Sequence, residues 1–380
     1  MKYPKVRQPD TSGVRRVRAI IIGIFFAIIV LPGLSMALGF GSLTKILENR
    51  KLADWPKQEF TQDVSGYLTA LQSWFDDHFG LRAELVKLRG QIDYSLFDYS
   101  ARVHIGRDGW LFYRSVMDVQ KPGVDRYLAT DGGKVVAGIE VLMRSLRQRG
   151  VTLVLMTPPM KDDLYGEFLP LSARRVPAPT RAESLVERLK RVDGLVFVDA
   201  LSILRETAKK RQVFHRTDFH WNDAAAYEVA KSLVDQISRR EGRPQSAWPH
   251  ELTITTRDIV GGESIFIPMF WTIHEQGMFV DDKRTVPNPT YVNGPAPFLY
   301  HMDQPPNARL LPPIAVLGDS FFDGIERAGI YHPFQKYYRT SGPTISQFVD
   351  GLPQDARYAV VEFIEISYGR LIEFASMAPK

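Results

Sequence analysis

The strongest constraint on the fold is a short apolar run near the C-terminal end, residues 314–317, which breaks at Gly318 and is followed by Asp319 and Ser320. An apolar run of this length that ends in glycine is typical of a strand buried on both faces of a parallel sheet. In open α/β sheets, reacting groups collect at the carboxyl ends of such strands. The run therefore predicts a parallel sheet with Ser320 placed as a nucleophile.

A serine nucleophile needs a general base and a third group that orients the base. Residues 217–222, Thr-Asp-Phe-His-Trp-Asn, supply both, because Asp218 and His220 are separated by one residue. Residues two apart in an extended segment lean to the same side, so Asp218 can hold Nδ1 of His220 while Nε2 faces Ser320. The pattern predicts an Asp-His-Ser triad. Its order along the chain does not count against it, since the same geometry occurs in unrelated orders.

Each motif alone has a simpler explanation. Gly-Asp-Ser is common in turns and at helix N-termini, and Asp-x-His is common in surface turns. His215, Asp218 and His220 also have the nitrogen and oxygen donors of a metal site, although no further Cys or His cluster completes one. The occurrence of both motifs in one chain favours the triad, and we expect neither a metal nor a cofactor.

The middle and end of the chain alternate between helix and strand patterns. Helices are expected over 135–149, 180–191, 201–211 and 223–239, and strands over 151–156, 195–198 and 358–364. The helix at 223 follows the Asp-x-His segment directly, with Asn222 or Asp223 as its N-cap. This alternation predicts an α/β fold with a doubly wound parallel sheet and right-handed crossovers.

Two other regions flank this sheet. Residues 41–100 have a helical pattern, and residues 103–113 alternate around an Asp108-Gly109 turn, which predicts a hairpin. Between about 241 and 313 Pro and Gly become frequent, and short strands are expected at 252–256 and 264–267. We interpret this stretch as an insertion that covers the site within a catalytic domain spanning 101–380.

Residues 19–40 contain no charged side chain, and at about 1.5 Å per residue they span the roughly 30 Å core of a bilayer. The preceding tail, 1–18, carries six basic residues and one acidic residue, so it is expected to stay in the cytoplasm and send the rest across the membrane. The alternative is a signal peptide cleaved after Ser35-Met36-Ala37. Both an uncleaved anchor and a cleaved signal peptide would export the catalytic part of the chain.

Charge and cysteine content narrow the functional classes. The net charge of +5 resides in the first eighteen residues, which leaves the remainder near neutral. A basic face that binds nucleic acid is therefore not expected. The chain has no cysteine, so neither disulfides nor a thiol nucleophile is available.

The motifs at 217–222 and 318–321 occur with three further blocks: Glu-Asn-Arg-Lys-Leu-Ala at 48–53, Gly-Arg-Asp-Gly-Trp-Leu-Phe-Tyr at 106–113, and Pro-Pro-Met-Lys at 158–161 followed by Tyr165. In this order the blocks resemble the SGNH-hydrolase-like proteins of bacterial exopolysaccharide O-acetylation, typified by periplasmic alginate O-acetyltransferases. The resemblance covers about residues 48–370. One departure is Ile366, which stands where the family tends to have an arginine after glutamate, so a charged contact of that arginine near the acceptor sugar is in question.

The resemblance implies roles for particular residues. Ser320 would accept the acetyl group, His220 would be the general base, and Asp218 would orient it. Four further positions in the matching blocks would bind substrate: Lys161, Tyr165, Trp221 and Asn222.

It also implies a setting: O-acetylation of an alginate-like exopolysaccharide in the periplasm through an acetyl-serine, by a protein anchored once in the inner membrane. A membrane-bound O-acyltransferase would supply the acetyl groups, since acetyl-CoA is cytoplasmic. Two alternatives remain open, a carbohydrate acetyl esterase with the same triad and a non-catalytic polysaccharide-binding assembly subunit.

Overall fold

The computed structural model describes residues 12–38, 51–57, 60–118, 125–173, 179–243, 253–281, 284, 286–291, 298–305 and 307–377. The chain divides into two compact units, residues 1–97 with 268–271 and residues 98–267 with 272–380. Most of the predicted basic tail, the block at 48–50 and Leu252 lie outside the described residues. The division into tail, anchor, helical segment and catalytic domain stays a prediction.

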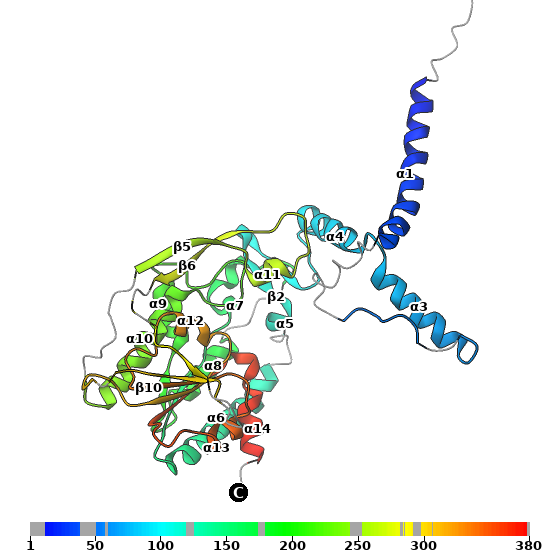
Figure 1. Cartoon of the computed structure of the whole chain (residues 1–380). Coiled ribbons are helices and arrows are strands. Elements are labelled where there is room, and N and C mark those ends of the chain that lie inside the picture. Colours follow the sequence, from blue (N-terminus) through cyan, green and yellow to red (C-terminus); the bar gives the residue numbers. More distant parts are fainter. Residues whose placement is uncertain are drawn as a thin grey trace, which may run out of the picture. The chain divides into compact units, whose positions relative to one another are not determined.

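The described part of the first unit is helical (Figure 1). It contains α1 (Ser12–Ala37), α3 (Val64–His78) and α4 (Arg82–Phe97). Within α1, Arg15–Met36 is long and apolar enough to cross a membrane, a few residues earlier in the chain than predicted. Asp63 caps α3 by accepting a hydrogen bond from the Gly66 N–H, which satisfies one of the free donors of the first turn.

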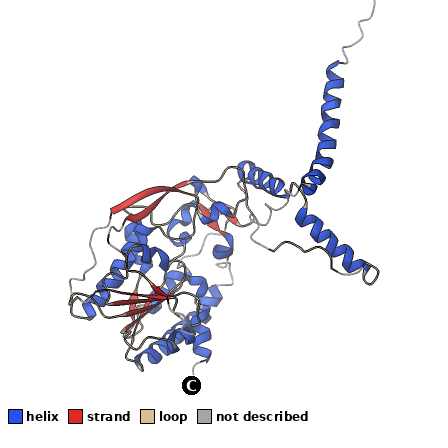
Figure 2. Ribbon diagram, viewed as in Figure 1, coloured by secondary structure: helices blue, strands red, loops and turns tan. Residues whose placement is uncertain are grey.

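The second unit is built on a seven-stranded sheet, the group of strands at the lower left of Figure 2. Its strands in spatial order are β4 (Val196–Val198), β3 (Thr152–Met156), β11 (Tyr358–Glu362), β9 (Ile314–Leu317), β10 (Lys336–Thr340), β8 (Tyr300–Asp303) and β7 (Thr290–Tyr291). The first five are parallel, whereas β8 and β7 are antiparallel to their neighbours. All four residues of the central strand β9 are buried, as its apolar run predicted.

Helices cover both faces of this sheet. One face packs against α6 (Asp125–Arg147), α8 (Arg181–Leu189), α13 (Ile345–Asp350) and α14 (Gly369–Met377); the other packs against α9 (Ala200–Ala208), α10 (Asp223–Arg240) and α12 (Phe322–Arg327). Along β3, Leu153 and Leu155 face the first layer, while Val154 and Met156 face the second. This arrangement confirms the predicted doubly wound α/β sheet, with two antiparallel strands added at one edge.

Smaller elements lie outside the main sheet. The predicted hairpin consists of β1 (Val103–Ile105) and β2 (Leu111–Tyr113), followed by α5 (Arg114–Met117). The short helix α7 (Lys161–Tyr165) follows β3. The predicted insertion contributes a second hairpin, β5 (Thr253–Ile259) with β6 (Glu275–Asp281), as well as β7 and β8.

The prediction of a strand at 264–267 is wrong, because this region contains the single-turn helix α11 (Gly262–Ile265). Its first N–H groups donate to the loop at 217–218 instead of entering a strand ladder: Gly262 bonds Asp218 Oδ2, and Glu263 bonds Thr217 O. The alternation of Ser264, Ile265 and Ile267 fits a turn of helix as well as a strand, and Ile265 is exposed.

Candidate active site

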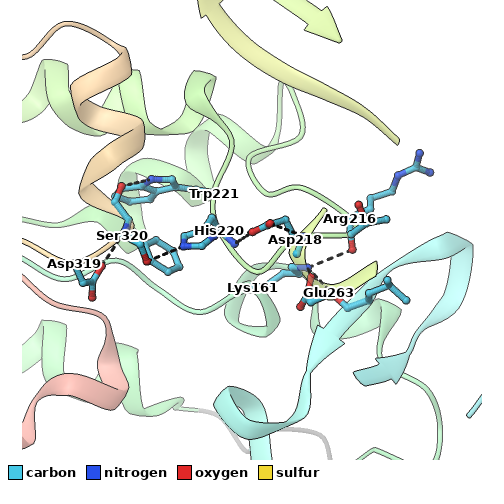
Figure 3. A network of polar contacts seen from close by, with 12 residues as sticks. Lys161, Arg216, Asp218, His220, Trp221, Glu263, Asp319 and Ser320 are labelled. Atoms are coloured by element: carbon cyan, nitrogen blue, oxygen red, sulfur yellow. Dashed lines mark hydrogen bonds and ion pairs between the residues drawn. The ribbon is translucent and has the colours of Figure 1, made fainter. Parts of the chain in front are cut away.

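Three side chains form a continuous hydrogen-bonded chain at the carboxyl end of the central sheet (Figure 3). Ser320 lies in the turn between β9 and α12, and its hydroxyl is 2.8 Å from His220 Nε2. His220 Nδ1 is in turn 2.6 Å from Asp218 Oδ1. Ser320 is exposed, whereas the side chains of His220 and Asp218 are 27% and 22% exposed. The hydroxyl is thus accessible, while the two groups behind it are partly shielded.

The bonds of Asp218 fix the tautomer of His220. Burial alone would raise the pKa of Asp218, but hydrogen bonds from the His220 side chain and from the backbone N–H groups of His220 and Gly262 lower it far below its usual range. An ionised carboxylate only accepts hydrogen bonds, so Nδ1 of His220 must carry the proton. Nε2 then presents a lone pair to the Ser320 hydroxyl, which is the arrangement a general base requires.

A buried carboxylate from the insertion holds the loop that carries Asp218. Glu275, at the start of β6, is 3% exposed. It accepts hydrogen bonds from the Arg216 N–H at 2.8 Å, the Thr217 N–H at 2.8 Å and the Thr217 hydroxyl at 2.7 Å. These three bonds compensate the cost of burying the carboxylate and fix the backbone immediately before Asp218.

Lys161 also supports this loop through a hydrogen bond to Arg216 O (Figure 3). Its ammonium group donates to the carbonyls of Leu111 and Arg216, at 2.7 and 3.3 Å, and to Glu263 Oε2 at 2.6 Å. Burial lowers the pKa of Lys161 and raises that of Glu263 to about 7, and the attraction between the two groups opposes both shifts. The three acceptors match the three N–H bonds of a charged ammonium group. The hairpin of β1 and β2, the loop at Arg216 and the helix α11 are therefore joined by this buried ion pair.

Hydrogen bonds to its backbone carbonyl groups hold the turn that carries Ser320 in place. Arg339, a buried residue on β10, donates to Gly318 O at 2.9 Å and to Asp319 O at 3.1 Å. Trp221 Nε1 donates to Phe321 O at 2.9 Å. Because Trp221 follows His220 in sequence, this bond ties the loop of the base directly to the turn of the nucleophile.

The backbone N–H groups of the turn also donate hydrogen bonds within the protein, with one exception. The Asp319 N–H donates to Glu362 Oε2 at 3.0 Å, and the Asp319 carboxylate accepts from the N–H groups of Phe321 and Ile364 at 2.9 and 3.1 Å. The N–H groups of positions 318 and 322 bond backbone carbonyls. Among these five positions, all of which the structure describes, only the Ser320 N–H has no protein acceptor.

Glu362 is a buried carboxyl group at the end of β11. Burial raises its pKa well above the usual value, and repulsion from Asp319 adds to this effect. Its Oε2 accepts from the Asp319 N–H, whereas Oε1 has no hydrogen-bond partner. Burial therefore favours the neutral form of this carboxyl group beside Asp319.

The four predicted substrate-binding residues lie behind the triad. Lys161, Trp221 and Asn222 are 3%, 1% and 0% exposed. Asn222 caps α10 by accepting from the Ala225 N–H and donates to Gln212 O. The half-buried Tyr165 accepts from the Val213 N–H and stacks on a tryptophan ring. Contact of these four side chains with substrate stays a prediction.

Sequence reasoning missed the roles of Glu275 and Arg339. A charged residue within the buried strand β10 signals a buried partner for Arg339, but the sequence does not say which. No signal of this kind marks Glu275. The metal alternative gains no support, since within the described ranges no three His, Cys, Asp or Glu side chains are arranged to hold a metal ion.

Comparison with known proteins shows what this chain is similar to. Residues 103–261 match the sequence model described as "SGNH hydrolase-like domain, acetyltransferase AlgX". This match confirms the resemblance inferred from the motifs and, with the α/β sheet, the predicted SGNH-hydrolase-like fold. Asp218 and His220 lie inside the matched region, and Ser320 lies beyond it.

Curated relatives bear the name probable alginate O-acetylase AlgJ. The protein from Pseudomonas syringae pv. tomato is 26% identical over 262 residues, which are 67% of this chain and 61% of the relative. The one from Pseudomonas fluorescens is 28% identical over 240 residues, 61% of this chain and 56% of the relative. The chain thus spans about three fifths of the length of these relatives.

Solved structures with a similar arrangement include the O-acetyltransferase domain of AlgJ from Pseudomonas putida. It is 18% identical with a TM-score of 0.44, over 73% of this chain and 93% of that one. PatB1 from Bacillus cereus is 12% identical with a TM-score of 0.48, over 64% of this chain and 93% of that one.

The buried ion pair predicts a large stability cost for Lys161→Met. The substitution leaves the Glu263 carboxyl group without its partner in the interior, so the free energy of unfolding should fall by about 3–5 kcal/mol. The double variant Lys161→Met/Glu263→Leu should recover part of this loss. Lys209→Met, which removes the exposed pair with Glu206, is the control and should cost about 0–1 kcal/mol. Equal, small effects of Lys161→Met and Lys209→Met in urea unfolding would contradict the interpretation.

The raised pKa of Glu362 predicts that Glu362→Gln leaves stability almost unchanged below about pH 4, where the carboxyl group is protonated in both the folded and the unfolded chain, whereas Glu362→Ala lowers stability there. The raised pKa means that the stabilising contribution of Glu362 is complete below its unfolded pKa and is lost as pH rises through the folded value. The wild type should therefore lose stability relative to Glu362→Gln as pH rises above about 4. Unfolding midpoints across pH measure this difference, and a Gln variant as unstable as the Ala variant at every pH would count against a protonated carboxyl.

Proposed function

We propose that this protein transfers acetyl groups to hydroxyls of an alginate-like exopolysaccharide in the periplasm, through an acetyl-serine on Ser320. The observation that carries the proposal is the hydrogen-bonded chain from Asp218 through His220 to an exposed serine hydroxyl. The names of the curated relatives, probable alginate O-acetylases, support the proposed substrate class.

In the first step, Ser320 Oγ attacks the carbonyl carbon of an acetyl donor while His220 Nε2 takes the hydroxyl proton. The imidazole becomes an imidazolium, and the ionised Asp218 stabilises its charge through the Nδ1–H bond. Phe219 and Phe321 lie against the imidazole, with ring centroids 4.0 and 4.9 Å from it, and hold its plane.

The tetrahedral intermediate places negative charge on the former carbonyl oxygen, which requires hydrogen-bond donors fixed in advance. The Ser320 N–H fits this role because it has no protein acceptor, while its neighbours in the turn are all engaged. Collapse of the intermediate expels the leaving group, which takes the proton from His220, and leaves the acetyl ester on Ser320.

In the second step, a sugar hydroxyl attacks the acetyl-serine, His220 accepts its proton, and that proton returns to Ser320 Oγ as the ester bond to the enzyme breaks. Water in place of the sugar would make the same site an esterase. We favour transfer, because the curated relatives are named for acetylation. Lys161, Trp221 and Asn222 act in this mechanism as positioning residues, since their bonds hold the base and the nucleophile turn.

The setting proposed for the reaction follows from α1. In this proposal α1, which is long and apolar enough to cross a membrane, anchors the chain in the inner membrane. The basic residues before it keep the N-terminus in the cytoplasm, which puts the catalytic part in the periplasm. The acetyl donor must then be delivered across the membrane, because acetyl-CoA is cytoplasmic. We propose a membrane-bound O-acyltransferase as the partner that supplies it.

Ser320→Ala is expected to abolish acetylation, because the nucleophile is removed while the fold remains. Incubation of the wild type with a chromogenic acetyl ester should add one acetyl group to the peptide containing Ser320, detected by mass spectrometry. Ester turnover should fall by at least about 10³-fold in Ser320→Ala and in His220→Ala. Ser202→Ala, at an exposed serine bonded to Asp199 and not to a histidine, should keep full turnover.

The acceptor decides between the candidate functions. With an added oligosaccharide acceptor, a transferase acetylates the sugar, whereas an esterase releases only acetate. Wild-type protein that binds polysaccharide but neither turns over the ester nor carries acetyl on Ser320 would support the non-catalytic subunit and overturn the proposal.

Gly261 gives a second test that leaves the triad residues unchanged. A Cβ at position 261 would lie 2.2 Å from Thr217 O, so Gly261→Ala must displace the loop that carries Asp218. Small displacements of catalytic groups reduce rates by about 10²-fold. The control is Gly166→Ala, where a Cβ meets no atom within 4 Å. Ester turnover measures both, and equal rates would show that the contact with Thr217 does not set the position of Asp218.

A further inference from the structure

The helix α4 carries an uncovered apolar stripe. Leu85, Leu88, Ile92 and Leu96 are 49%, 46%, 40% and 72% exposed. Their spacing of three, four and four residues places all four on one face of the helix. Single exposed leucines are ordinary on a protein surface, but a continuous row of them along one helix face indicates an interaction surface.

The segment 268–271 adds two exposed aromatic side chains to this helix. At Gly90 the two backbones are so close that a Cβ would lie 2.0 Å from Pro268 O, and the Trp271 N–H donates to Gln91. The rings of Phe270 and Trp271 are 48% and 73% exposed. Tryptophan is enriched where proteins meet the interface between lipid and water, and phenylalanine occurs on the apolar face of helices that lie in this interface.

The end of α1 lies against the start of α4. Ser35, in the last turn of α1, donates its hydroxyl proton to Gly80 O at 2.8 Å, and Gly80 lies in the corner between α3 and α4. A Cβ at Gly80 would lie 2.2 Å from Pro32 O, so the corner and α1 are in close backbone contact. The apolar segment of α1 ends at Met36, so the corner before α4 contacts the C-terminal end of this segment.

We propose that α4, together with Phe270 and Trp271, lies on the membrane surface, with the stripe at 85, 88, 92 and 96 in the boundary between headgroups and acyl chains. A helix of 16 residues is about 24 Å long, a sufficient length to lie in this interface. Arg89 beside the stripe is 82% exposed and forms an ion pair with Asp93, and its exposed guanidinium suits lipid phosphates. The inference depends on α1 crossing the membrane and is independent of the proposed acetyl transfer.

A second copy of the chain or another protein could also cover an apolar stripe. The bilayer is the favoured occupant because the chain itself brings α4 to it: the contact between Ser35 and Gly80 joins the anchor to the start of this helix. No partner has to be recruited for the stripe to be covered.

The absence of cysteine from the sequence makes a direct test possible with the full chain. Single variants Ile92→Cys and Leu88→Cys are labelled with the dye NBD and reconstituted at one chain per nanodisc of phosphatidylcholine containing lipids spin-labelled near the headgroup. Asp93→Cys, turned about 100° from Ile92 on the same helix, and Leu171→Cys, at a leucine that is 99% exposed in the second unit, are the controls.

The dye at 88 and 92 should show blue-shifted emission and lose most of its intensity to the spin-labelled lipids, whereas the dye at 93 and 171 should lose little. Equal quenching at 92 and 93, or no quenching at 92, overturns the proposal. A dye at 92 that is shielded from water but not quenched by the lipids also overturns it, because protein then covers the stripe.

A charged variant provides a second measurement that does not depend on labelling the stripe centre. In Leu88→Glu/Ile92→Glu the dye at Leu96→Cys should lose its lipid quenching, because carboxylates oppose insertion, while Arg89→Glu should retain most of it. Circular dichroism confirms that each variant keeps its helix content. Quenching that survives the double charge substitution contradicts docking through this face.

Discussion

The site depends on one carboxylate that satisfies three donors at once. Asp218 accepts from Nδ1 of His220, from the backbone N–H of the same residue, and from the Gly262 N–H at the start of α11. The first bond fixes the tautomer, the second closes the local turn, and the third joins the loop to the insertion. Removing the carboxylate would leave the histidine without orientation and two backbone donors without an acceptor.

Two buried groups extend this arrangement away from the reacting atoms. Glu275 holds the N–H groups of the loop, and Lys161 holds the Arg216 carbonyl. Buried charges of this kind add little net stability, since desolvation offsets the attraction, but they admit few alternative geometries. On the nucleophile side, Arg339 and Trp221 bind carbonyl groups around Ser320. The base and the nucleophile come from chain positions 100 residues apart, and buried donors and acceptors keep them 2.8 Å apart.

The sequence predicts those parts of the fold and the site that depend on neighbouring residues. The apolar run before Gly318, the one-residue spacing of Asp218 and His220, and the cap at Asn222 each depend on a few neighbouring residues. The partners of Lys161, by contrast, come from a hairpin 50 residues earlier and a helix 102 residues later. No short-range pattern encodes such contacts, so the sequence did not indicate the buried partners of Lys161. The same holds for α11. Its first N–H groups donate to the distant loop at 217–218, and this stabilisation leaves no sign in the local sequence, which fits a strand equally well.

The central claim is that ionised Asp218 holds a proton on Nδ1 of His220 and directs Nε2 to Ser320. Proton NMR of the protein labelled with ¹⁵N in histidine tests this most directly, because a proton in a short bond between imidazole and carboxylate resonates far downfield. We predict such a resonance on Nδ1 of His220, retained in Ser320→Ala and lost in Asp218→Ala. A His220 proton located on Nε2, or an Nδ1 resonance unchanged by Asp218→Ala, would contradict the account.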